Sequence, residues 1–170
     1  LKEVAADFIE GRPNDRIGLV SYAAESYTKT PITSDKAIVL NSLEEITYGV
    51  LEDGTAIGMG LATSVNRLKE SKAISKVIIL LTDGQNNAGE IDPRTAAELA
   101  ATYNIKIYTI GTGTNQDVSF IPGAGYIRNE IDEETLSYIA EKTGGRYFRA
   151  KDLQALESIF SEIDTLYLRN

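Results

Sequence analysis

The sequence predicts an α/β domain in which a mostly parallel sheet carries helices on both faces. The segment Val77–Thr82 reads VIILLT, a continuous apolar run, and such runs are typical of strands that are covered on both faces. Two further segments, Ile17–Tyr22 and Ile105–Ile110, also read as buried strands. Stretches with apolar residues at helical spacing separate the three segments, and this alternation favours a parallel sheet with crossover helices.

The first part of the chain predicts a helix followed by two strands. The helix includes Val4 and ends at Gly11. The strand Ile17–Tyr22 follows it. The shorter segment Ser26–Thr30 is expected to be an edge strand that Pro31 ends, because proline has no N–H to donate to a neighbouring strand.

Two helices are expected between these strands and VIILLT. Asp35 is the expected N-cap of the first, since aspartate accepts hydrogen bonds from the free N–H groups at a helix start. The inner face of this helix carries Val39, Leu43 and Ile46. The second helix has a regular apolar stripe made of Ile57, Leu61, Val65 and Leu68.

Three more helices are expected, each with an aspartate at its N-cap: Asp92, Asp132 and Asp152. Pro93 strengthens the first, because proline favours the first helical position. Gly144 and Gly145 end the second, and the segment Arg146–Arg149 is expected to form the last strand. The inner face of the final helix carries Leu156, Phe160, Ile163 and Tyr167.

The composition fits a single domain over residues 1–170 and excludes several classes of function. The net charge of −8 disfavours nucleic acids and anionic membranes as main partners. The sequence has no Cys and no His, which excludes thiolate nucleophiles, Ser-His-Asp triads, and metal sites built from Cys or His. Because Leu1 lies inside an expected helix, we expect the domain to be truncated at its N-terminus.

Two oxygen-bearing side chains are expected at the edge where the parallel strands end. Asp83 directly follows VIILLT, and Thr55 precedes the helix that begins near Ile57. Ligands of open parallel sheets bind outside the carboxyl ends of the strands, and carboxylate and hydroxyl oxygens suit Mg²⁺, Mn²⁺ or Ca²⁺. Structural roles remain open at this point: a turn aspartate for Asp83 and a helix cap for Thr55.

Other motifs give weaker indications of a functional site. Gly111 and Gly113 follow a strand, but Gln116 breaks the dinucleotide-binding fingerprint, so a structural turn is expected there. The sequence contains no Gly-Lys dipeptide, which excludes a phosphate-binding P-loop. The polar run Gln85-Asn86-Asn87 lies on the same expected rim as Asp83, where a functional role and a plain polar loop are equally open.

Three motifs together resemble the von Willebrand factor type A (VWA) domain: VIILLTDG at Val77–Gly84, DGTAIG at Asp53–Gly58 and TGGRYFRA at Thr143–Ala150. More narrowly, the strings NDRIGLVSYA and EIDPRTAAELA look like the bacterial aerotolerance-operon (Bat-type) members. The resemblance covers essentially the whole chain. It implies a doubly wound, Rossmann-like, mostly parallel sheet with one short antiparallel edge strand.

The resemblance also implies a function. The family carries a metal-ion-dependent adhesion site (MIDAS), in which an Asp-x-Ser-x-Ser motif, a loop Thr and a strand-end Asp hold an ion that binds a carboxylate of the partner. Thr55 matches the family Thr and Asp83 the family Asp. The implied function is a non-enzymatic protein-binding module whose ligand has an acidic side chain. Bat-type members further imply a membrane-anchored protein of bacterial envelope stress tolerance, associated with a MoxR-type ATPase.

The chain departs from the family in one respect, because it contains no Asp-x-Ser-x-Ser motif. The nearest string, Asp117-Val118-Ser119, is expected in a loop. With only Thr55 and Asp83 as ligands, we expect weak Mg²⁺ binding or none, since Mg²⁺ demands near-octahedral coordination. A metal-free interaction scaffold is therefore the main alternative. A metal-assisted phosphoryl-transfer enzyme is less supported, since Gly111 stands where such enzymes usually carry Lys.

The departure also concerns the sheet. The family's first, central strand would lie between Ile17–Tyr22 and Val77–Thr82, and no segment of this chain corresponds to it. Both neighbouring strands would then have an open edge, and open edges are templates for pairing with another chain. We expect either self-association through these edges or direct pairing of the two strands.

Overall fold

A computed structural model describes residues 2–12, 14–22, 26–45, 57–82, 91–112, 118–121, 125–128 and 133–168. The helices are α1 (Lys2–Glu10), α2 (Lys36–Glu44), α3 (Ile57–Leu68), α4 (Pro93–Thr102), α5 (Glu133–Thr143), α6 (Leu153–Glu162) and the π-helical segment η1 (Ile163–Leu168). The strands are β1 (Ile17–Tyr22), β2 (Ser26–Thr33), β3 (Lys76–Thr82), β4 (Ile105–Thr112), β5 (Val118–Ile121), β6 (Gly125–Arg128) and β7 (Tyr147–Ala150).

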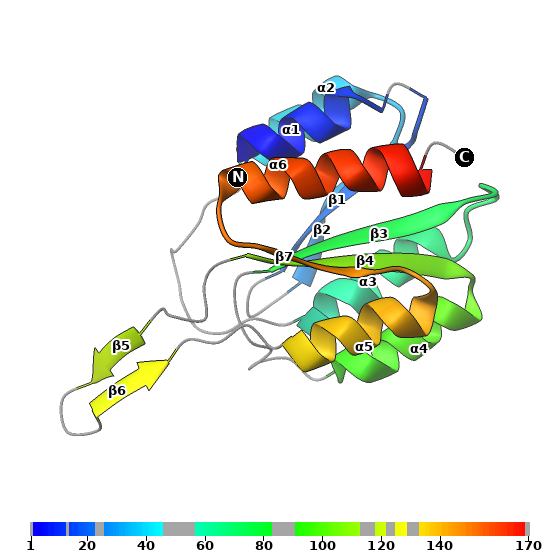
Figure 1. The fold of residues 1–170 in the computed structure, drawn as a ribbon. Helices are drawn as coiled ribbons and strands as arrows, with labels where there is room; N and C mark the ends of the chain where they lie inside the picture. The colour runs from blue at the N-terminus through cyan, green and yellow to red at the C-terminus, as the bar shows by residue number, and fades with distance from the viewer. Residues whose placement is uncertain are drawn as a thin grey trace.

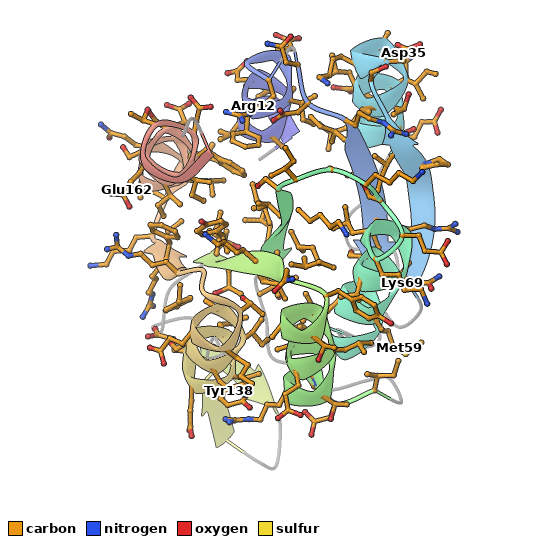
Figure 2. All side chains as sticks on the ribbon, turned by 90° about the vertical axis from the view of Figure 1, so that its right-hand side faces the viewer. Arg12, Asp35, Met59, Lys69, Tyr138 and Glu162 are labelled. Carbon is orange, nitrogen blue, oxygen red and sulfur yellow. The ribbon has the colours of Figure 1, made fainter. Side chains whose placement is uncertain are left out.

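Strands form the middle layer, and helices cover both of its sides (Figure 1). Figure 2 shows α1, α2 and α6 on one side, and α3, α4 and α5 on the other. β3, β4 and β7 form a parallel three-stranded sheet in that order, whereas β1–β2 and β5–β6 are antiparallel pairs. The expected α/β architecture, with helices on both faces of a parallel sheet, is thereby confirmed.

β4 is the most deeply buried strand, because it has a strand on each side and helices above and below. Ile105, Ile107 and Ile110 are each 0% exposed. Ile105 and Ile107 join the core cluster that includes α3, α4 and α5, whereas Tyr108 and Ile110 join the cluster that includes α1, α6 and β7. Full burial of one such side chain contributes about 1.5–3 kcal/mol, so β4 is the centre of the hydrophobic core.

Three of the aspartates expected to cap helices do so. Asp35 accepts a hydrogen bond from the N–H of Ala37 at 3.1 Å. Asp92 accepts one from Arg94 N and Asp152 one from Ala155 N, each at 2.8 Å. These caps fix where the helices begin, because the first N–H groups of a helix have no partner within it. The fourth, Asp132, lies outside the described residues.

The three-stranded sheet and the β1–β2 pair are separate. Among the described strands, β1 pairs only with β2, and β3 pairs only with β4. The direct pairing of β1 with β3 that the sequence left open is therefore not found in the described part of the chain. Helix α3 contacts β1, β2 and β3, so it packs across both sheets from one side.

Two sequence-based expectations about strands are wrong. β2 does not end at Pro31 but continues to Thr33. Its pairing with β1 shifts where Ile17 lies opposite Thr33 and Leu19 opposite Thr30. The stretch of β2 between these pairs is one residue longer than that of β1, and such a bulge is where a strand accommodates proline.

The second wrong expectation concerns Asp117-Val118-Ser119, which was expected in a loop. Val118 begins β5, and β5 pairs with β6 in an antiparallel hairpin. Figure 1 shows this hairpin extending away from the sheets and their helices. Its strands have only four residues each, which is too short for alternation to distinguish them from loop sequence.

The C-terminal helix also differs from its expected course. The apolar spacing predicts one continuous helix through Tyr167, but α6 ends at Glu162 and η1 follows it with π-helical geometry. Ile163, the first residue of η1, is still 0% exposed. The change in winding therefore begins at a residue that remains in the core.

Candidate functional site

The candidate site lies at the edge where the parallel strands end. Figure 1 shows β3, β4 and β7 ending on the side of the domain at which α3, α4 and α5 begin. This arrangement follows from the alternation of strand and helix, because each helix returns antiparallel to the strand before it. Strand carboxyl ends and helix N-termini therefore meet at one edge, which is the usual ligand-binding edge of an open parallel sheet.

Both predicted ligands, Thr55 and Asp83, lie outside the described residues, and only their neighbours can be located. Thr82, the residue before Asp83, is the last of β3 and is 5% exposed. Ile57, two residues after Thr55, is the first of α3 and is 0% exposed. Each predicted ligand is thus linked within two residues to a buried, fixed point of this edge.

The ends of β3 and β4 are held together. Thr82 lies opposite Gly111 in the parallel register. The Thr112 hydroxyl donates a hydrogen bond to the Thr82 carbonyl at 3.3 Å. This side-chain bond extends the contact between the two strands to the last residue of each, so the chain leaves β3 toward Asp83 from a well-anchored position.

Gly58 explains part of the DGTAIG motif. A Cβ at this position would lie 1.9 Å from the Ile91 carbonyl oxygen and 3.1 Å from Pro93 N. Only a residue without a side chain therefore allows the first turn of α3 to approach the start of α4 this closely. The segment that begins with Asp83 leads into α4, so the contact brings the flanks of both predicted ligands together.

Gly145 has the same role in the TGGRYFRA motif. A Cβ there would lie 1.9 Å from the Ile107 carbonyl oxygen, so a glycine is needed where the chain enters β7 beside β4. Glycine is favoured at position 144 for a different reason. The φ of Gly144 is +83°, a backbone conformation that residues with a side chain rarely adopt. The two glycines that were expected only to end α5 therefore also determine how β7 joins the sheet.

A polar cluster that the sequence did not predict lies beside β7. Arg149 Nη1 and Glu133 Oε1 are 2.5 Å apart, which joins β7 to the first residue of α5. Burial, and to a lesser extent the Glu133 carboxylate, raises the pKa of the nearby Tyr147 to about 12, while Arg149 opposes the shift. The alternation in Arg146–Arg149 places Tyr147 and Arg149 on one face, and this was the available signal.

The described residues do not by themselves form a metal site. In this part of the chain, no group of three or more Asp or Glu side chains is placed to hold an ion. Asp92, a carboxylate at the start of α4, is engaged with the N–H of Arg94. The divalent ion at Thr55 and Asp83 consequently stays a prediction.

Comparison of the chain with known protein families identifies this architecture. The model of the von Willebrand factor type A domain matches residues 1–162. The chain belongs to this family. The VWA domain is a protein-interaction module, and the resemblance inferred from the three sequence motifs is confirmed.

Solved structures agree with the family. The protein BatB of Bacteroides thetaiotaomicron matches with a TM-score of 0.78 and 26% identity, covering 96% of this chain and 84% of that one. An aerotolerance-related membrane protein of Bacteroides fragilis shares the fold with a TM-score of 0.76 at 24% identity, over 95% and 84% of the two chains. Proximal thread matrix protein 1 of the mussel byssus, described with a zinc-occupied MIDAS motif, matches with a TM-score of 0.73 and 25% identity, over 95% and 38%.

The VWA domain is one part of longer relatives. A protein of Borreliella burgdorferi without an assigned function is 34% identical over an alignment of 160 positions, which covers 89% of this chain and 46% of the relative. The chain spans about half the length of the curated bacterial proteins that it matches. Within the described residues, no helix has the length and apolar character needed to cross a membrane.

Proposed function

We propose that this VWA domain binds an acidic side chain of a protein partner through a divalent ion held by Thr55 and Asp83, without catalysing a reaction. The observation that carries the proposal is the convergence at one edge. β3 ends directly before Asp83, and α3 begins two residues after Thr55. The ion, when bound, supplies positive charge that bridges the domain and the partner's carboxylate.

The chemistry of the donors selects the ion. A carboxylate and a hydroxyl oxygen suit Mg²⁺, Mn²⁺ or Ca²⁺. The mussel byssus protein, described with zinc in its MIDAS motif, supports a divalent ion in a domain of this fold. We expect weak binding in this chain, because two protein ligands do not provide the near-octahedral site that Mg²⁺ requires.

Titration with magnesium chloride tests the ion site, followed by calorimetry and by the NMR shifts of the Thr82 and Gly111 amides. We expect a dissociation constant in the millimolar range or weaker, and no binding by Asp83→Ala. The matched control is Asp7→Ala, which removes an exposed carboxylate of α1 and should leave the titration unchanged. Undiminished binding by Asp83→Ala, or its unfolding in circular dichroism, would contradict the role of Asp83.

The carboxylate part of the proposal needs its own test, for which acetate is a suitable probe. In the presence of Mg²⁺, acetate should shift the Thr82 amide further, because it occupies an open position of the ion. The same acetate addition without Mg²⁺ is the control. An equal acetate shift in both conditions would show that the ion does not mediate carboxylate binding.

The proposed setting is the bacterial envelope, where the domain would be the water-exposed part of a membrane-anchored protein in stress tolerance. The match to BatB supports a Bat-type protein, and a MoxR-type ATPase is the associated system that the resemblance implies. Self-association through open strand edges is a further expectation. Sedimentation equilibrium over a range of concentrations tests it.

A metal-free interaction scaffold is the second candidate function. It is favoured by the absence of an Asp-x-Ser-x-Ser motif from the sequence, which leaves only Thr55 and Asp83 as matches to the family's ligands. The magnesium titration distinguishes the two candidates, because a scaffold leaves the Thr82 and Gly111 amides unshifted at any magnesium concentration. A phosphoryl-transfer enzyme has less support, since Gly111 stands where such enzymes usually carry a lysine.

A further inference from the structure

The edge of the three-stranded sheet opposite the candidate site carries several lysines. Because α3, α4 and α5 run antiparallel to β3, β4 and β7, these helices end where the strands begin, and Figure 2 views the domain from this edge. Five lysines lie here, at the ends of α3 and α5, in the connection from α3 to β3, and at the starts of β3 and β4. These residues define the lysine edge: Lys69, Lys72, Lys76, Lys106 and Lys142.

The lysines lie on neighbouring elements and face the solvent. Lys76 begins β3, and Lys106 lies opposite Val77, one position further along the parallel register. Lys142 belongs to the last turn of α5. Among the residues that the structure describes, none of the five lysines forms an ion pair. Lys72, Lys106 and Lys142 are exposed, so their charges are available to a partner.

The nearby carboxylates neutralise only part of this charge. Glu162, at the end of α6, already pairs with Arg146 at 3.3 Å. Glu70, in the connection from α3 to β3, and Glu141, in the last turn of α5, are exposed acidic residues among the lysines. Five lysines against these two glutamates leave the lysine edge positive, although the whole chain has a net charge of −8.

An exposed isoleucine lies among the lysines. Ile74, in the connection from α3 to β3, is fully exposed. The turn directly before it has hydrogen bonds of its own: the Ser71 N–H donates to the Leu68 carbonyl at 2.9 Å, and the Ala73 N–H donates to Ser71 Oγ at 3.2 Å. A single exposed apolar side chain is common on protein surfaces. Its place between lysines, on an ordered turn, is what points to a partner that is both anionic and apolar.

We propose that the lysine edge docks on an anionic lipid surface, with Ile74 inserted between the headgroups. Lysines near such a surface are attracted by the headgroup phosphates, and an apolar side chain beside them enters the boundary of the acyl chains. A nucleic acid would use the lysines but would offer no apolar layer to Ile74. The candidate site lies at the opposite edge, so it stays accessible to a protein partner, and this inference does not depend on the proposed metal site.

The net charge of the whole chain does not oppose this docking. Helix α3, which runs between the two edges, has 12 residues and is therefore about 18 Å long at 1.5 Å per residue. The Debye length is about 10 Å at 0.1 M salt, so acidic residues at the far edge are screened from a surface that touches the lysine edge. The local charge, and not the net charge, therefore decides the interaction.

Cosedimentation with lipid vesicles tests the proposal, in a buffer with EDTA so that no divalent ion contributes. The anionic vesicles contain equal parts of phosphatidylglycerol and phosphatidylcholine, and vesicles of phosphatidylcholine alone are the lipid control. We expect binding to the anionic vesicles only, and its loss when sodium chloride is raised to about 0.5 M. Lys72→Gln should weaken binding about fivefold, and Ile74→Ser about tenfold.

Each variant has a matched control near the opposite edge, where α6 begins. Lys151→Gln removes an exposed lysine there, and Leu153→Ser removes an apolar side chain that is 56% exposed. Both controls should bind the anionic vesicles as the parent chain does. Equal weakening by Lys72→Gln and Lys151→Gln would overturn the proposal, because binding would then follow the overall charge and not the lysine edge.

Three further outcomes would also overturn lipid docking. The first is no binding of the parent chain to the anionic vesicles, and the second is undiminished binding by Ile74→Ser, since insertion is part of the proposal. The third concerns a short DNA duplex, measured by fluorescence anisotropy in the same buffer. Tighter binding to the duplex than to the vesicles, weakened by Lys72→Gln, would make a nucleic acid the partner of the lysine edge.

Discussion

The three-stranded sheet and the β1–β2 pair contain similar apolar strands but bury them differently. In β4, the isoleucines at 105, 107 and 110 are 0% exposed. In β1, by contrast, Ile17, Leu19 and Val20 are all only partly buried. β4 has a strand on each side, whereas β1 has one partner and an irregular register. The difference teaches that the burial of an apolar strand depends on the strands and helices packed around it as well as on its own hydrophobicity.

The largest expected effect comes from truncating a side chain in each sheet. Ile107→Ala should lower the free energy of unfolding by about 4 kcal/mol, because it leaves a cavity in the main core. Leu19→Ala should cost only about 1 kcal/mol, since this side chain is already partly exposed. Urea denaturation monitored by circular dichroism measures both. Equal losses would mean that the β1–β2 pair is as well packed as the three-stranded sheet.

A smaller loss of stability is expected at Gly145, where the backbone approaches that of β4 closely. Gly145→Ala should destabilise the domain by about 3 kcal/mol, because its Cβ would lie 1.9 Å from the Ile107 carbonyl oxygen. Gly144→Ala is the neighbouring control. No atom lies within 4 Å of its added Cβ, so only the positive φ is unfavourable, at about 1 kcal/mol. The same denaturation experiment ranks the two variants, and the reverse ranking would contradict this account of Gly145.

Alkaline pH should lower the free energy of unfolding through ionisation of Tyr147, which lies in the three-stranded sheet. Burial, followed by the Glu133 carboxylate, raises the pKa of Tyr147 to about 12 in the folded protein, above the ordinary value of about 10. The neutral phenol is therefore favoured by folding, and its contribution is complete below pH 10 and lost as the pH rises through 12. Because Tyr147 is partly exposed, we expect the loss to be about 1 kcal/mol.

Tyr147→Phe isolates this contribution, since it keeps the ring and removes the titrating hydroxyl. Unfolding free energies measured between pH 9 and about pH 12 should fall less steeply in Tyr147→Phe than in the parent chain. Tyr103→Phe is the control, because that tyrosine is 38% exposed and lies at the end of α4. A parallel pH dependence in the Tyr147→Phe variant and the parent would exclude Tyr147 as the source.

The smallest effect is expected at a surface ion pair between the residue before β7 and the last residue of α6. Arg146 Nη1 and Glu162 Oε2 are 3.3 Å apart, with side chains 57% and 38% exposed. Glu162→Gln should change stability by less than about 0.5 kcal/mol, because solvent screens exposed pairs. Urea denaturation at low and high salt measures it. A loss comparable to that of Ile107→Ala would mean that charge pairing, and not apolar burial, holds β7 and α6 together.

The sequence predicts the candidate site only in outline, and its two ligands stay predictions. A carboxylate after the run VIILLT indicated Asp83, and the start of the α3 pattern indicated Thr55. The pairing of Arg149 with Glu133 was not predictable, because the two residues are far apart in the sequence and meet only when β7 packs beside α5. The role of Gly58 was likewise hidden, since the Ile91 carbonyl oxygen comes near it only in the folded chain.

The sequence by itself determined the local structure of this protein. Apolar spacing, capping aspartates and glycines determined where most helices begin and end, because these effects act within one turn of the chain. The end of α6 at Glu162 is the exception, since the apolar spacing continues beyond it. Tertiary structure alone decided that β2 bulges past Pro31, that β5 and β6 form a hairpin, and that β1 and β3 belong to separate sheets. Strand pairing joins distant segments, so its register and partners depend on the packing of the whole domain and not on local sequence.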